Sequence, residues 1–97
     1  MSLRGDPVEE RVTLPDGRHV RIRVGVPEDP YIPKKELDTV DVELFEGERP
    51  LAAVTTVLDA RDTSDARRLA REIASGLESG RLEPTAAAIE PLADSRP

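Results

Sequence analysis

The chain has 97 residues, with 14 basic and 20 acidic side chains and a formal net charge of −6. A chain of this length forms one small domain, and its negative charge disfavours diffuse attraction to nucleic acid or to an anionic membrane. The sequence has no cysteine, no long apolar run and no signal-peptide pattern. We therefore expect a soluble, cytoplasmic protein without a disulfide framework or a membrane span.

Residues 1–7 carry no apolar periodicity, and we expect them to form a flexible N-terminus. From Val8 onward, apolar and polar side chains alternate on both sides of Pro15-Asp16-Gly17, which predicts a β-hairpin. Proline fixes φ, aspartate suits the next turn position and glycine accepts a positive φ, so these three residues favour a tight loop. With Leu14 paired to Arg18, the expected cross-strand pairs are Val12 with Val20, Val8 with Val24 and Glu9 with Arg23.

A second hairpin follows residues 27–37, a connection that contains three prolines. Residues 40–45 alternate again, Gly47 marks a turn, and residues 51–58 form the next strand. With a loop of two or four residues we expect one apolar face that combines Val40, Val42 and Leu44 with Leu51, Ala53 and Val57. Two tandem hairpins predict a four-stranded antiparallel sheet.

One helix is predicted over residues 64–79, where apolar side chains recur at helical spacing. Thr63 or Ser64 can cap it, Asp65 suits its positive end and Gly80 is placed to stop it. The segment 85–92 is either one helical turn begun by Thr85 or a short edge strand ended by Pro91.

These elements predict an α+β fold: a four-stranded antiparallel sheet, made of two tandem hairpins, followed by one helix packed on one face. We expect residues 8–82 to form the single ββββα domain and residues 83–97 a partly ordered C-terminal segment.

The strand at residues 51–58 is apolar or small on both alternations, so it needs cover on both faces. One helix covers only one face, which leaves the C-terminal segment or a second copy of the chain for the other. We expect a homodimer. The predicted interface residues are Phe45, Ala52, Val54, Thr56 and Leu58.

A partner contact is predicted in the proline-rich connection, which presents Tyr31, Ile32, Lys34 and Lys35 between rigid prolines. The alternative is that Tyr31 and Ile32 fold over the open end of a small core.

No catalytic, metal-binding or cofactor-binding residues are expected. His19 is the only histidine and has no nucleophile beside it, and the spacing Asp59-x-x-Asp62-x-x-Asp65 suits helix capping better than a calcium loop. The acids and arginines of the first three strands predict a solvated ladder of opposite charges.

The leading hypothesis is therefore a non-enzymatic interaction protein that forms a homodimer. It would bind another protein through the Tyr31 connection or the arginine-bearing helix face. The alternative is a small-ligand or nucleic-acid binding module that uses Arg11, Arg18, Arg21 and Arg23 of the first hairpin. A second possible nucleic-acid footprint runs from Arg61, before the helix, along Arg67, Arg68 and Arg71. The acidic balance and the two aromatic residues argue against nucleic acid.

Overall fold

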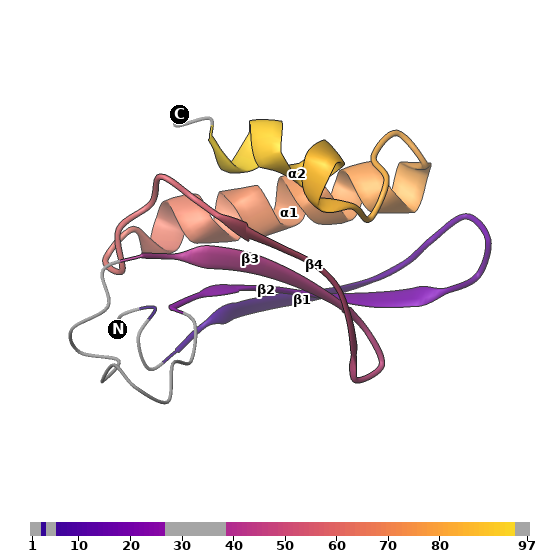
Figure 1. The fold of residues 1–97 in the computed structure, drawn as a ribbon, viewed down its shortest axis with the longest axis horizontal. Helices are drawn as coiled ribbons and strands as arrows, with labels where there is room; N and C mark the ends of the chain where they lie inside the picture. The colour runs from indigo at the N-terminus through magenta and orange to yellow at the C-terminus, as the bar shows by residue number, and fades with distance from the viewer. Residues whose placement is uncertain (1–2, 4–5, 27–38, 95–97) are drawn as a thin grey trace.

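A computed structural model describes residues 3, 6–26 and 39–94 of the chain. The fold is α+β, as the sequence predicts. Its elements are β1 (Val8–Thr13), β2 (His19–Gly25), β3 (Asp41–Glu46), β4 (Arg49–Thr55), α1 (Thr63–Ser79) and α2 (Ala86–Ala93). The strands form one antiparallel sheet in the order β1-β2-β3-β4. Both helices lie on one side of this sheet (Figure 1). The other side, which no described helix covers, is called the open face.

The first hairpin has the predicted register. Val12 lies opposite Val20, and the Leu14 amide donates to the Arg18 carbonyl at 2.8 Å to close the loop. Gly17 has a φ of 93° and donates back to the Leu14 carbonyl at 2.9 Å. The positive φ explains why glycine stands at this position, since other residues rarely adopt it.

The second hairpin corrects the predicted pairing of β3 with β4. Its two-residue loop begins at Gly47, whose φ of 63° suits the first position of a II′ turn. A β-bulge between Leu44 and Phe45 then shifts the ladder by one residue, so that Leu44 lies opposite Ala52. The prediction that Ala53 and Val57 share the core face is wrong, because Ala53 pairs with Glu43 and is exposed and Val57 is 45% exposed. Leu51 does pack against the core, as predicted. Side chains alternate with a period of two, so a shift of one residue exchanges the two faces of β4.

Helix α1 packs its apolar stripe against β1 and β2. The buried stripe consists of Ala66, Leu69, Ala70, Ile73, Gly76 and Leu77. The helix begins one residue earlier than predicted, with Asp62 rather than Thr63 or Ser64 at the N-cap position. Gly80 ends it as predicted, in the left-handed conformation with a φ of 78°.

The segment after α1 resolves the choice between a helical turn and a strand, because it forms α2. Thr85 is the N-cap, and its hydroxyl accepts from the Ala88 amide at 3.3 Å. Helix α2 packs on β4 beside α1, with Ile89 fully buried in the core. The C-terminal segment therefore covers the part of the sheet that α1 does not reach (Figure 1).

The core is aliphatic throughout the described residues and lies between the sheet and the two helices. Leu3 belongs to it, although residues 1–7 were expected to be flexible: its side chain is buried and its amide donates to the Ala60 carbonyl at 2.9 Å. The largest fully buried side chains are Leu3, Ile22, Leu44, Ile73, Leu77 and Ile89, together with Val20, Val24, Val26, Val40 and Val42.

Candidate functional site

A groove of about 800 Å³ runs along the outward side of α1, and we call it the α1 groove. One wall is the exposed face of the helix. The other is formed by the segment that connects α1 to α2 and by α2 itself. The lining residues are Ser64, Arg67, Arg68, Arg71, Glu72, Ser75, Gly76, Arg81, Leu82 and Leu92.

The connecting segment is held against α1 by a close backbone approach. The left-handed Gly80 reverses the chain, and the Leu82 amide then donates to the Gly76 carbonyl at 3.0 Å. A Cβ on Gly76 would lie 2.9 Å from the Leu82 Cβ, a distance that real Cβ contacts do not reach. Glycine at position 76 is therefore what lets this wall of the groove approach the helix.

The groove is strongly basic within an acidic protein. The guanidinium groups of Arg67, Arg68 and Arg71 are exposed, and none has an ion pair with a residue that the structure describes. Arg81 is oriented by neutral partners, since it donates to the Ser79 hydroxyl at 2.9 Å and reaches the Ser75 hydroxyl at 3.5 Å. Four arginines thus face one glutamate in the groove, whereas the chain as a whole carries a net charge of −6.

Helix stability does not explain the placement of Arg67 and Arg71, although Arg68 has Asp65 three residues before it and Glu72 four residues after it. Arg67 and Arg71 are four residues apart, and like charges at that spacing destabilise a helix by a few tenths of a kcal/mol. Cations are favoured in the last turn of a helix, yet the last turn of α1 contains no basic residue. The charges of Arg67 and Arg71 are therefore not compensated at helical spacing along α1.

The open face has a different character, because most of its charges are paired. The Arg23 guanidinium lies 2.9 Å from the Glu43 carboxylate, and both side chains are at least three-quarters buried. Arg21 lies 3.7 Å from the Glu9 carboxylate, and its guanidinium stacks 4.7 Å from the centre of the Phe45 ring. These two ion pairs agree with the predicted ladder of opposite charges only in part. Arg11 lies opposite Arg21 and has no ion pair with a residue that the structure describes, and Arg23 and Glu43 are largely buried rather than solvated.

A second hollow, of about 610 Å³, lies beside the first hairpin, and we call it the hairpin pocket. It contains His19, whose Nδ1 lies 3.1 Å from the Thr13 hydroxyl. The lining residues are Arg11, Val12, Thr13, His19, Val20, Arg21, Gly47 and Glu48.

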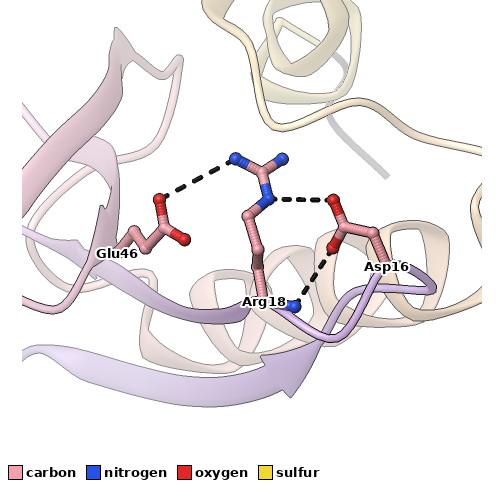
Figure 2. A network of polar contacts seen from close by, with 3 residues as sticks. All are labelled: Asp16, Arg18 and Glu46. Atoms are coloured by element: carbon pink, nitrogen blue, oxygen red, sulfur yellow. Dashed lines mark hydrogen bonds and ion pairs between the residues drawn. The ribbon is translucent and has the colours of Figure 1, made fainter.

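Arg18, named with the hairpin arginines in the sequence, is engaged by two acids. Figure 2 shows its side chain between Asp16, at 3.0 Å, and Glu46, at 3.8 Å. A hydrogen bond from the Arg18 backbone amide, assisted by the charge of its guanidinium, lowers the pKa of Asp16 despite slight desolvation. Arg18 thus links the two hairpin turns and is a structural residue of the sheet.

The predicted partner-contact residues Tyr31, Ile32, Lys34 and Lys35 lie outside the described residues. The predicted dimer-interface residues are described, but the β-bulge separates them.

Phe45 lies on the open face beneath Arg21. Ala52 and Val54 pack against the core on the helix-covered side, and Thr56 and Leu58 are buried. Packing within one chain accounts for these last four residues, so self-association stays a prediction.

The acids before α1 order the turn from which the helix starts. The Asp62 carboxylate accepts from the Asp59 amide at 2.8 Å, and the Asp59 carboxylate accepts from the Arg61 amide at 2.9 Å. Among the described residues, no group of three or more histidine or acidic side chains is arranged to hold a metal ion.

Sequence reasoning identified the arginines of α1 but missed Arg81 and the groove. Gly80 is the residue that could have revealed the groove, because a left-handed residue at the end of a helix brings the next residues back along that helix.

Within residues 3, 6–26 and 39–94, no helix is long and apolar enough to cross a membrane. Comparisons of the chain with protein-family models, with curated proteins and with solved structures found no match.

Proposed function

We propose that this protein is a non-enzymatic binding domain of the cytoplasm whose α1 groove takes an acidic segment of another protein. The observation that carries the proposal is that Arg67, Arg68 and Arg71 lie along one groove and make no ion pair with any residue that the structure describes. Arg67 and Arg71 do not stabilise their own helix either, so such cations are suited to an anionic partner.

The chemistry of the lining favours carboxylates accompanied by aliphatic side chains. A guanidinium is a planar fork that binds a carboxylate through two parallel hydrogen bonds. Leu82 and Leu92 are half-buried in the same groove and offer an apolar surface beside the charges. A segment that alternates acidic and aliphatic residues would satisfy both parts of the lining.

A protein partner fits the groove better than a nucleic acid does. Single-stranded nucleic acids bind by stacking their bases on aromatic side chains, and no aromatic residue lines the groove. The net charge of −6 also repels a polyanion at long range, whereas a short acidic segment meets mainly the local positive field.

Self-association is the second element of the proposal and comes from the apolar strand at residues 51–58. Light scattering of the protein alone, at two protein concentrations and two salt concentrations, measures it directly. A dimer whose mass does not change with salt would support an apolar interface, and a monomer under all four conditions would remove the homodimer from the proposal.

The test of the α1 groove is fluorescence anisotropy with a labelled peptide of alternating glutamate and leucine. Three variants of the measurement are needed: the same peptide with lysine in place of glutamate, a single-stranded RNA, and the acidic peptide at raised salt. We expect the acidic peptide to bind most tightly and to weaken as salt rises, because exposed ion pairs are screened.

Charge reversal then locates the binding. Arg68→Glu removes an attraction and adds a repulsion, so we expect about a tenfold loss of affinity for the acidic peptide. Arg49→Glu makes the same charge change at an exposed position of β4 outside the groove, and we expect a loss of less than about twofold. Equal losses in the two variants, or tighter binding of RNA that Arg68→Glu abolishes, would contradict the proposal.

A further inference from the structure

We propose that the hairpin pocket binds the phosphate group of a small molecule, at a site separate from the α1 groove. The inference rests on the placement of Arg11 and Arg21, which are directly opposite each other on β1 and β2 and lie on the open face. Like charges directly opposite one another destabilise an antiparallel pair.

The acids of the open face do not compensate both arginines. Glu43 is engaged by Arg23, and Glu9 reaches Arg21 at 3.7 Å. Arg11 is exposed and has no ion pair or side-chain hydrogen bond with a residue that the structure describes. One positive charge therefore stands uncompensated beside a second that is only weakly paired.

Two further polar side chains line the pocket next to this pair of charges. Thr13 and His19 form the next cross-strand pair toward the turn, with the Thr13 hydroxyl 3.1 Å from the imidazole Nδ1. Arg11, Thr13, His19 and Arg21 thus all line one hollow. The hydrogen bond between Thr13 and His19 uses one donor of that pair, which leaves the other for a ligand. A phosphate group has three terminal oxygens and up to two negative charges, so it can use several of these donors at once.

The size and charge of the surroundings favour a small molecule. The pocket volume of about 610 Å³ is within the range of small-ligand sites. Glu48 lies at its edge and disfavours an extended polyanion, and Phe45 is occupied by the Arg21 guanidinium and does not line the pocket. Neither feature suits a nucleic-acid strand, which needs a continuous basic track and free aromatic rings.

The experiment is an NMR titration of the labelled protein with inorganic phosphate, compared with sodium chloride at equal ionic strength. We expect saturable amide shifts at residues 11–13 and 19–21 that chloride does not produce. Arg11→Gln should weaken phosphate binding by about tenfold, since it removes a charged donor. Arg61→Gln is the matched control, because it removes the same charge at an exposed position outside both sites, and it should leave the titration unchanged.

Thermal unfolding gives a second test, because the effect of Arg11→Gln on the unfolding temperature should depend on whether phosphate is present. Without phosphate and at low ionic strength, Arg11→Gln should unfold at a higher temperature than the wild type, because it removes the repulsion between the two arginines. Phosphate should stabilise the wild type more than the variant and so reduce or reverse this difference.

Three results would overturn the inference: shifts that do not saturate, shifts of equal size in Arg11→Gln, or shifts confined to the α1 groove. The result of the peptide experiment with Arg68→Glu is independent of the phosphate titration, because the α1 groove and the hairpin pocket share no lining residue.

Discussion

The packing of α2 on β4 can be tested by truncating the one large side chain that α2 buries completely. Ile89 is 0% exposed and belongs to the core cluster, whereas Leu92 is only half-buried. Replacing a buried isoleucine with alanine costs 2–5 kcal/mol, depending on how far the site collapses. Helix α2 is only eight residues long and buries only Ile89 and Ala93, so it can relax into the cavity. We therefore expect Ile89→Ala to cost about 2–3 kcal/mol.

The assay is urea unfolding followed by circular dichroism at two protein concentrations. Val57→Ala is the control, because Val57 is 45% exposed and its truncation should change stability by less than about 0.5 kcal/mol. A domain of this size is stable by about 5–15 kcal/mol, so the expected loss for Ile89→Ala is easily measured. An Ile89→Ala variant as stable as the control, together with stability that rises with protein concentration, would refute the assignment of α2 as the cover of β4.

Three further predictions follow from single contacts. Gly76→Ala should destabilise the protein, because the new Cβ would lie 2.9 Å from the Leu82 Cβ and overlap it. This cost should exceed the gain of about 1 kcal/mol that alanine brings to a helix relative to glycine. If urea unfolding showed the variant to be more stable than the wild type, the connecting segment would not be held against α1 at this point. A double-mutant cycle on Arg23→Ala and Glu43→Ala should give a coupling energy of about 1 kcal/mol, because the pair is 2.9 Å apart and largely buried; a coupling of zero would mean that the ion pair does not form in solution. Because the pKa of Asp16 is lower in the folded protein than its ordinary value of 3.8, the ionised carboxylate stabilises the fold at pH values above 3.8. This stabilisation is lost as the pH falls through the lower pKa of the folded state. Asp16→Asn should therefore reduce stability at neutral pH and approach the wild type in acid, and a difference independent of pH in thermal unfolding would contradict the pKa shift.

The first hairpin could be predicted residue by residue because its turn chemistry and its alternation agree. Pro15-Asp16-Gly17 fixed the loop length, and the apolar pattern then allowed only one register, with Val12 opposite Val20. Helix α1 could be predicted equally well, because the helical spacing of its apolar residues and its end at Gly80 both follow from local sequence.

The second hairpin could not be predicted to the same depth. Its loop is one of the two lengths considered, but the bulge between Leu44 and Phe45 has no strong sequence signal and reverses the faces of β4. That reversal is why Ala52 and Val54 pack against the core rather than on an outer face. Helix α2 was ambiguous because the segment 85–92 is short and contains Pro91, and only its packing on β4 decides its conformation.

The candidate sites depend on tertiary structure even more strongly. Arg67, Arg68 and Arg71 are visible as a basic helix face, but the groove needs Arg81 and Leu82 to return along α1. The opposition of Arg11 and Arg21 does follow from the predicted register, whereas the pocket around them also needs Gly47 and Glu48 from the second turn.

The most direct test of the α1 groove is NMR of the arginine side-chain Nε–Hε groups during titration with the glutamate–leucine peptide. We expect the signals of Arg67, Arg68, Arg71 and Arg81 to shift together and to saturate at one peptide concentration. The signals of Arg21 and Arg23, which are paired on the open face, should stay in place. Shifts spread evenly over all arginines, or absent from the four groove arginines at saturation, would contradict the proposed function.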